Sequence, residues 1–302
     1  MSRNPSRREI LAAGIGLAGL QAAQAETPVI IDTHVHFWDT RRPEGVSWPP
    51  KTDALLYRPV LPAEYSALVR PPGVTGAVII EASSWLEDNQ WILDLVKDNP
   101  LFVGYVGHLN PGTDDFRTQL ARFSKNRLFR GIRVAGADLV KGIPQPLFLD
   151  DLKRLADADL MMDALGNASM VGPLTTIAEK IPNLRIVIDH MPVEPPGWKP
   201  DTMRELARHP QVYCKVSTVL KRVAGKVPED PASYKASLDE LWDIFGPDRV
   251  MYGSNWPVSL NLAPYPTVFN IVKQYVAGRG AADSEKYFAK NSKACYKWID
   301  RT

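Results

Sequence analysis

His34 and His36, two histidines separated by one residue, are the side chains best placed to do chemistry in this sequence. They follow Asp32 and an apolar run over residues 29–33, and such a run predicts a buried β-strand. Two imidazoles at one strand end can grip a single metal ion or a single substrate carbonyl from fixed directions. The sequence therefore predicts an active site at the end of its first strand.

The chain has five histidines, and two others also follow apolar runs. His108 comes after residues 102–106, and His190 comes after residues 185–189. His209 instead stands beside Pro210 near the end of a predicted helix, and a histidine there interacts favourably with the helix C-terminus. Four histidines are therefore expected at strand ends, and His209 is expected on the surface.

Short apolar runs alternate with amphipathic stretches along the chain. Most of these runs are continuously apolar, as strands covered on both faces should be. Eight strand–helix repeats in about 250 residues predict a (β/α)8 barrel, the TIM barrel, as one domain over residues 26–302. An open doubly wound sheet is the competing fold, but it usually carries a Gly-rich loop after its first strand, which this chain lacks. The predicted strands span residues 29–33, 77–81, 102–106, 131–134, 160–165, 185–189, 212–216 and 249–252.

In such a barrel the active residues lie at the C-terminal ends of the strands. The catalytic candidates by this rule are His34, His36, His190 and Asn255. Arg133 suits a substrate carboxylate, and its alternative is a salt bridge near the barrel rim. The loops over residues 38–62 and 191–200 both follow strands, so both are expected over the mouth of the barrel. The candidate substrate-binding residues are Glu81, Trp85, His108, Arg133, Asp163 and Lys215.

The first 25 residues are expected to be a twin-arginine signal peptide. Arg7 and Arg8 precede a modestly apolar stretch over residues 10–20, and Ala23-Gln24-Ala25 fits a signal-peptidase site. The apolar stretch is shorter than the roughly 20 residues that a membrane span requires, so we expect no stable span. The prediction is export through the twin-arginine translocon to the periplasm.

The 302 residues carry a formal net charge of +2, which belongs to the predicted signal peptide. The remaining chain is formally neutral, so nothing favours a nucleic-acid partner or an anionic membrane surface. A small molecule is the expected partner, and the oligomeric state stays open. Cys214 and Cys295 are the only cysteines, and we expect two buried free thiols, with a disulfide as the alternative.

Four segments together resemble a known family. They are residues 31–39 (IDTHVHFWD), 131–133 (GIR), 188–190 (IDH) and 252–258 (YGSNWPV). The combination, in this order, is similar to the amidohydrolase-related (amidohydrolase 2) family of the amidohydrolase superfamily. Within that family it most resembles the sugar-lactonase and pyrone-dicarboxylate-lactonase group. The resemblance spans essentially the whole chain after residue 26.

The resemblance implies a TIM-barrel hydrolase that opens a small polar or acidic lactone. It places His34 and His36 in the first-strand site and His190 after a middle strand. It also implies either one divalent metal, zinc first, on His34 and His36, or operation without metal. The family's final strand carries an acid that acts as general base on the hydrolytic water. This chain has Asn255 at that position, as some members of the group do.

Asn255 leaves the proton of the hydrolytic water without its usual acceptor. An amide cannot take a proton at useful pH, and losing a general base costs on the order of 10²–10⁴ in rate. A site histidine is the first substitute, followed by Glu81 and Asp163. Two other functions stay open: a decarboxylase, which needs no base to activate water, and a degenerate paralogue that only binds a ligand.

Overall fold

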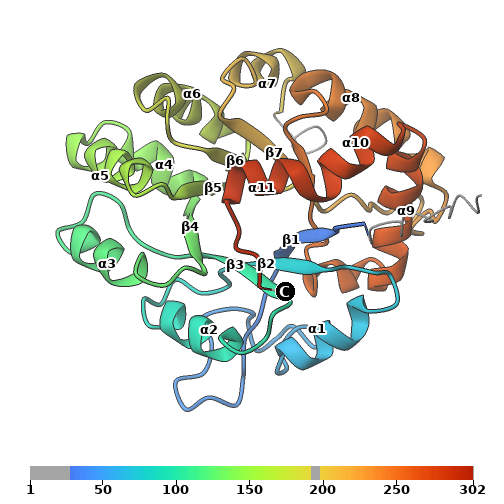
Figure 1. The fold of residues 1–302 in the computed structure, drawn as a ribbon, viewed down its shortest axis with the longest axis horizontal. Helices are drawn as coiled ribbons and strands as arrows, with labels where there is room; N and C mark the ends of the chain where they lie inside the picture. The colour runs from blue at the N-terminus through green and yellow to red at the C-terminus, as the bar shows by residue number, and fades with distance from the viewer. Residues whose placement is uncertain (1–27, 192–197, 302) are drawn as a thin grey trace, which may run out of the picture.

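Eight parallel strands form one sheet in the order β1 to β8 in the computed structural model, which describes residues 28–191 and 198–301 (Figure 1). A parallel bridge joins Val35 to Trp256, and the His36 N–H donates to the Trp256 carbonyl at 3.0 Å. These contacts bring the first strand against the end of the last, so the sheet closes as the predicted TIM barrel. The strands are β1 Ile31–Val35, β2 Gly76–Ile80, β3 Phe102–Gly107, β4 Phe129–Ala135, β5 Met161–Leu165, β6 Ile186–Ile188, β7 Val212–Val216 and β8 Val250–Tyr252.

The first strand runs two residues beyond its predicted end. Val35 pairs with Ile79 of β2, so His34 lies inside β1 and only His36 follows it. The sequence pattern missed this extension because His34 is polar, yet its side chain is fully buried in the barrel. Pairing with neighbouring strands decides strand ends more strongly than the polarity of one residue.

Helices cover the outside of the barrel, and the structure adds one that the sequence pattern did not predict. Helix α4 has a glycine at each end, and glycine lowers helix propensity by about 1 kcal/mol. The helices are α1 Pro62–Val69, α2 Asp88–Val96, α3 Phe116–Phe123, α4 Gly136–Gly142, α5 Pro146–Asp157, α6 Val171–Lys180, α7 Pro200–Leu206, α8 Lys235–Phe245, α9 Tyr265–Ala277, α10 Ala281–Glu285 and α11 Asn291–Tyr296.

The barrel interior has an apolar layer, and charged side chains lie next to it toward the C-terminal ends of the strands. Side chains two positions apart on a strand share a face. Met161 and Val187 belong to the apolar interior cluster, and two positions further along their strands lie Asp163 and Asp189. The apolar layer is made by Ile31, Val78, Ile80, Val103, Val106, Met161, Val187, Met251, Cys295 and Tyr296.

Helix α11 lies across the centre of the ring of strands (Figure 1). Its Tyr296 packs into the apolar interior layer, and the Tyr296 hydroxyl donates to Asp163 Oδ1 at 2.9 Å. The helix therefore closes the end of the barrel opposite the strand C-termini. Cys295 on this helix and Cys214 on β7 are both free and buried, which confirms the prediction of two buried thiols.

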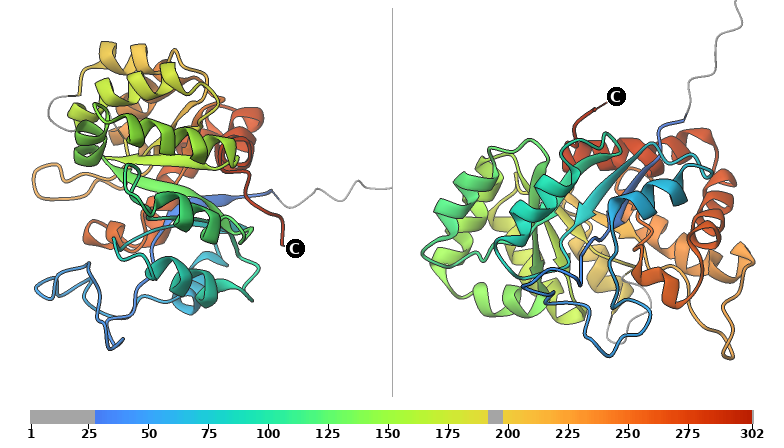
Figure 2. Two further views of the ribbon diagram at one scale, coloured as in Figure 1. Left: turned by 90° about the vertical axis from the view of Figure 1, so that its left-hand side faces the viewer. Right: turned by 90° about the horizontal axis from the view of Figure 1, so that it is seen from below.

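The segments after β1 and β7 project from one side of the barrel, and the C-terminus lies on the other (Figure 2). The loop over residues 38–61 delivers Ser47 and Trp48 to a cavity at the strand C-termini, as expected. The loop predicted over residues 191–200 and the predicted signal peptide lie largely or wholly outside the described residues. No helix within residues 28–191 and 198–301 is long and apolar enough to cross a membrane.

Candidate active site

A cavity of about 450 Å³ opens at the C-terminal ends of the strands. A second cavity of about 370 Å³ shares His190 with it and adds Asp189, Trp198 and Thr218. Side chains from seven strand ends, all except β3, therefore meet around these two adjoining cavities, as active residues do in barrels. The first cavity is lined by His36, Ser47, Trp48, Glu81, Ala82, Ser84, Arg133, Leu165, His190, Asn255 and Val258.

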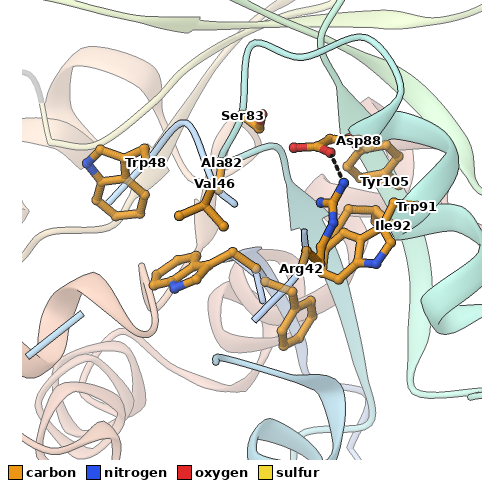
Figure 3. Close-up of a pocket in the computed structure, with 11 residues that line it drawn as sticks. Arg42, Val46, Trp48, Ala82, Ser83, Asp88, Trp91, Ile92 and Tyr105 are labelled. Carbon is orange, nitrogen blue, oxygen red and sulfur yellow. Dashed lines mark ion pairs between the residues drawn. The ribbon is translucent and has the colours of Figure 1, made fainter. Parts of the chain in front are cut away.

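Trp48 forms one wall of this cavity although it comes from the loop after β1. The loop is tied to α2 by Arg42, whose Nη2 lies 2.8 Å from Asp88 Oδ1 and whose guanidinium lies 4.7 Å from the Trp91 ring centre (Figure 3). The Trp48 ring in turn lies 6.4 Å, centre to centre, from the His36 ring. The loop is therefore held against α2 by Arg42, and its Trp48 lies beside the His36 ring.

His34 and His36 face each other through one nitrogen of each ring. Their Nε2 atoms are 3.1 Å apart, and His36 Nδ1 lies 2.9 Å from the Ile80 carbonyl. A carbonyl can only accept, so His36 Nδ1 carries the hydrogen and the neutral His36 Nε2 bears a lone pair. His34 Nδ1 has no closer partner than Asp189 Oδ1, at 3.6 Å. The two Nε2 atoms must therefore have a hydrogen or a cation between them.

A fully buried ion cluster lies next to this pair. The Lys215 ammonium donates to Asp163 Oδ2 and to Asp189 Oδ1, each at 2.8 Å. Burial, reinforced by the charge of Asp189, raises the pKa of Asp163 to about 7. Burial also acts to raise the pKa of Asp189, but Lys215 and His34 outweigh it and hold that pKa well below its usual range. Asp189 therefore stays ionised beside His34.

Arg133 reaches the cavity already paired. Its Nε donates to Glu81 Oε1 at 2.8 Å, and its Nη2 donates to the Glu81 carbonyl at 2.6 Å. Its Nη1 lies 3.8 Å from Asp189 Oδ2, beyond hydrogen-bond distance. The salt-bridge alternative describes this arrangement, and the two hydrogens on Nη1 and one on Nη2 are the donors that remain available.

The three histidines of the site are neutral at neutral pH. Burial lowers the pKa of His34 well below its usual range, assisted by the Lys215 charge. Burial and then Arg133 lower the pKa of His36 to about 3. Burial lowers the pKa of His190 to about 4, against the opposing charge of Asp189. These rings therefore act as hydrogen-bond donors and acceptors, not as fixed cations.

His190 and Asn255 meet at a residue that the sequence pattern did not single out. Thr218 Oγ1 lies 2.9 Å from His190 Nδ1 and accepts from Asn255 Nδ2 at 3.1 Å. Ser217 Oγ lies 2.8 Å from the same His190 nitrogen. The only signal in the sequence was the position of these hydroxyls directly after a predicted strand.

The barrel carries histidines on and just after its first strand and an amide just after its last. A family model described as Amidohydrolase matches residues 31–298. The chain belongs to the amidohydrolase family.

Two curated relatives of this amidohydrolase are lactonases. It is 32% identical over 238 residues to an L-fucono-1,5-lactonase of Burkholderia ambifaria, covering 76% of this chain and 80% of the relative. It is 26% identical over 282 residues to an L-fucono-1,5-lactonase of Burkholderia multivorans, covering 88% of this chain and 95% of that relative. The family and these relatives identify a hydrolase of the lactonase group.

Solved structures share the fold. An amidohydrolase from Burkholderia multivorans with bound zinc superposes with a TM-score of 0.78 at 23% identity, covering 90% of this chain and 100% of that chain. A 2,6-dihydroxybenzoate decarboxylase bound to 2,6-dihydroxybenzoate superposes with a TM-score of 0.63 at 13% identity, covering 89% and 99%. At these identities the similarity establishes the barrel alone.

The structure brings some of the predicted site residues of this amidohydrolase together and leaves others apart. Glu81 and Arg133 line the cavity, whereas Asp163 and Lys215 lie fully buried in the barrel interior. His108 lines a neighbouring cavity of about 270 Å³ that it shares with Arg133. Trp85 precedes α2 with 38% of its surface exposed and lines none of these cavities. The sequence pattern missed Trp48 because its distance from His36 depends on how the loop folds back.

The residues of this amidohydrolase only partly suit a metal. The 3.1 Å between His34 Nε2 and His36 Nε2 is close to the roughly 3.3 Å that separates two nitrogens on a tetrahedral zinc ion. A catalytic zinc ordinarily has three protein ligands. Asn255 is neutral and Asp189 is paired with Lys215, and the described chain holds no cluster of three His, Cys, Asp or Glu side chains suited to a metal. The described donor set is therefore incomplete for zinc.

Proposed function

We propose that this amidohydrolase hydrolyses a small, neutral, hydroxyl-rich lactone. One observation carries the proposal: among the described residues that line the cavity, the one cationic side chain, Arg133, is already paired with Glu81. The histidines there are neutral. A substrate carboxylate would have to break the Arg133–Glu81 pair or remain without a counter-ion, and a buried unpaired charge is costly.

The lining suits a compact polyol. A space of about 450 Å³ lies within the range for small-ligand pockets. Trp48 offers a broad apolar face, and Ser47, Ser84 and Glu81 offer polar groups for substrate hydroxyls. The names of the two lactonase relatives, which act on L-fucono-1,5-lactone, point in the same direction.

Arg133 is the group that we assign to polarise the lactone carbonyl. Pairing with Glu81 uses one hydrogen each of Nε and Nη2 and leaves both Nη1 hydrogens and the second Nη2 hydrogen as donors. Donors aimed at a developing oxyanion are worth roughly 3–4 kcal/mol of transition-state stabilisation. His36, anchored by Ile80 and by His34, presents a rigid ring against which the substrate is placed.

A lactone panel assayed with a pH indicator tests this function. We expect acid release from neutral sugar lactones, and at most slow release from lactones that carry carboxylates. We also expect His36→Ala to lose at least about 10²-fold in kcat/KM, with His209→Ala, outside the site, as the matched control. Because the described ligands are incomplete, chelator should leave the rate unchanged and added zinc should not raise it. Activity that appears only with zinc, or only on acidic lactones, contradicts the proposal.

Decarboxylation is the second candidate, and Asn255 is the observation that favours it, because loss of CO₂ needs no base to activate water. Release of CO₂ from carboxylic acids without hydrolysis of any lactone would establish it. Binding of lactones without any turnover would identify a ligand-binding paralogue instead.

We also propose that residues 1–25 direct export to the periplasm through the twin-arginine translocon. The paired Arg7 and Arg8 and the Ala23-Gln24-Ala25 motif support this assignment. Fractionation of cells and N-terminal sequencing check it, and a processed periplasmic protein beginning at Glu26 is the expected result. An unprocessed protein in the cytoplasm would contradict it.

A further inference from the structure

We propose that His190 Nε2 accepts the proton of the hydrolytic water in place of the family's acid, and that Ser217 and Thr218 hold the ring in the tautomer this requires. The inference rests on the proposed lactone hydrolysis. It makes Ser217 and Thr218 positioning residues and makes His190 the general base.

The contacts at His190 Nδ1 select the tautomer. Two hydroxyl oxygens, Ser217 Oγ and Thr218 Oγ1, lie 2.8 and 2.9 Å from this one nitrogen. A single N–H can be shared between two acceptors, whereas the single in-plane lone pair of a ring nitrogen accepts only one hydrogen well. The geometry therefore favours hydrogen on Nδ1. The neutral ring then carries its lone pair on Nε2, the nitrogen turned away from both hydroxyls.

Thr218 also sets the orientation of Asn255. Its hydroxyl oxygen accepts from Asn255 Nδ2 at 3.1 Å, which identifies the nitrogen end of the amide. The Asn255 carbonyl oxygen is then the end that can hold a water molecule as acceptor. His190 and Asn255 line the same cavity, so one water can donate to both the His190 lone pair and the Asn255 oxygen.

The backbone supports this assignment independently. His190, Thr218 and Asn255 have φ angles of 68°, 56° and 56°, in the left-handed region that non-glycine residues rarely adopt. They follow three consecutive strands, β6, β7 and β8, and a β-branched threonine is an outlier there. Such strained conformations persist where the surrounding structure over-determines them, and they cluster at functional sites. Here the side chains of His190 and Asn255 both contact the Thr218 hydroxyl.

The reaction balances with one side chain as base and then acid. Water transfers a proton to His190 Nε2 while its oxygen forms a bond to the lactone carbonyl carbon. The tetrahedral intermediate collapses and the bond between that carbon and the ring oxygen breaks. The proton on His190 Nε2 moves to the ring oxygen, which leaves as an alcohol. The product is the open hydroxy acid, and His190 returns to its neutral form.

Burial keeps His190 neutral before the reaction. The His190 ring faces Asp189 just after β6, Lys215 on β7, Arg133 on β4, and the neutral rings of His34 and His36. Burial outweighs Asp189 and lowers the pKa of His190 to about 4. Activity should therefore be lost as pH falls through about 4, because protonation removes the Nε2 lone pair.

Kinetics of four variants test the inference. We expect His190→Asn to lose on the order of 10²–10⁴ in kcat, and Thr218→Val to lose about tenfold or more in kcat with little change in KM. Thr218→Ser keeps the hydroxyl and should restore most of the rate. Asn255→Asp introduces a competing base, so the acidic limb of its pH profile should differ from that of the natural chain. Circular dichroism confirms that each variant is folded.

Two outcomes overturn the inference while leaving lactone hydrolysis intact. One is a natural chain that hydrolyses lactones while His190→Asn keeps its rate and the same acidic limb. The other is a ¹⁵N NMR spectrum of labelled histidine, with the His190 signals assigned by their loss in His190→Asn, that shows hydrogen on Nε2. A natural chain inactive on every lactone would instead refute the proposed function itself. Hydrogen on Nδ1, together with rescue by Thr218→Ser, supports the inference.

Discussion

Among single residues, Lys215 combines full burial with two carboxylate partners, Asp163 and Asp189. Removing charges from water is costly, and mutual attraction with good hydrogen bonds offsets that cost. The Tyr296 hydroxyl donates to Asp163 and completes the cluster. The cluster therefore couples the helix that closes one end of the barrel to the ionised Asp189 beside His34.

Replacement of Lys215 by methionine should lower the free energy of unfolding by about 3–5 kcal/mol, because it leaves two buried carboxyls without a cation. The loss should grow with rising pH, since protonation of the carboxyls relieves it. Denaturant unfolding measures the change, and Lys215→Met combined with Asp189→Asn should recover part of the loss. A single variant within about 1 kcal/mol of the natural protein would show that the cluster contributes little.

Among elements, the loop over residues 38–61 makes the cavity wall although it has little regular structure. Arg42 holds it to α2 through Asp88 and Trp91, and Trp48 stands at its cavity end (Figure 3). Binding residues are often placed on loops that a rigid scaffold positions. The Arg42 contact is therefore expected to affect substrate affinity more than the chemical step.

Arg42→Met should raise KM by on the order of fivefold with little change in kcat, as expected for a loss of about 1 kcal/mol at a half-buried ion pair. Arg41→Met is the matched control, because Arg41 is exposed and pairs only with Asp39 of its own loop. Hydrogen exchange of the loop amides should accelerate in Arg42→Met alone. If Arg41→Met raised KM as much as Arg42→Met, the prediction would be wrong, because the contact of Arg42 with α2 would then not be what supports substrate binding.

At the scale of the whole molecule, the residues that close the barrel also position the candidate active site. Asp32 Oδ1 accepts the N–H groups of His34 at 3.2 Å and Ser254 at 2.8 Å, so it joins β1 to the segment after β8. Gly253 passes so close that a Cβ there would lie 2.8 Å from the His34 Cβ. The contacts between β1 and the segment after β8 therefore fix the position of His34.

The free energy of unfolding should fall as pH drops from about 6.5 toward 4. The pKa of His36 is lowered to about 3 and that of His190 to about 4, with His34 also lowered, so unfolding takes up protons on all three rings below about 6.5. Asp163 opposes this, because its pKa raised to about 7 makes the folded state the better proton binder between about 4 and 7. Burial also raises the pKa of Asp32 and of Asp151, so these two carboxyls oppose the histidines as well, and the net slope should be at most about 2.7 kcal/mol per pH unit.

Urea unfolding at pH 7, 6 and 5 measures this slope. His190→Asn removes one of the rings that take up a proton on unfolding, so it should reduce the slope by about 1.4 kcal/mol per pH unit. A free energy of unfolding that stays constant between pH 6 and 5 would contradict the neutral, buried state of the three histidines.

Apolar runs and their order were enough to predict the barrel, and the motifs around His34, His190 and Asn255 indicated the amidohydrolase family. These features are readable because strand burial leaves a local pattern and barrel topology brings strand ends together. The fold brings His36, His190 and Asn255 to one cavity and buries His34 inside β1. The end of β1 and the short helix α4 were not predicted, since pairing and packing overrode a polar residue and two glycines.

Only the tertiary structure decided which side chains within that mouth are partners. It paired Arg133 with Glu81, placed Lys215 between two aspartates, set Thr218 between His190 and Asn255, and brought Trp48 to the cavity. A hydrogen bond depends on tenths of an ångström and on ring and amide orientation between strands far apart in the chain. Residue order carries no such distances, so the sequence predicted which residues form the site and the fold assigned their partners.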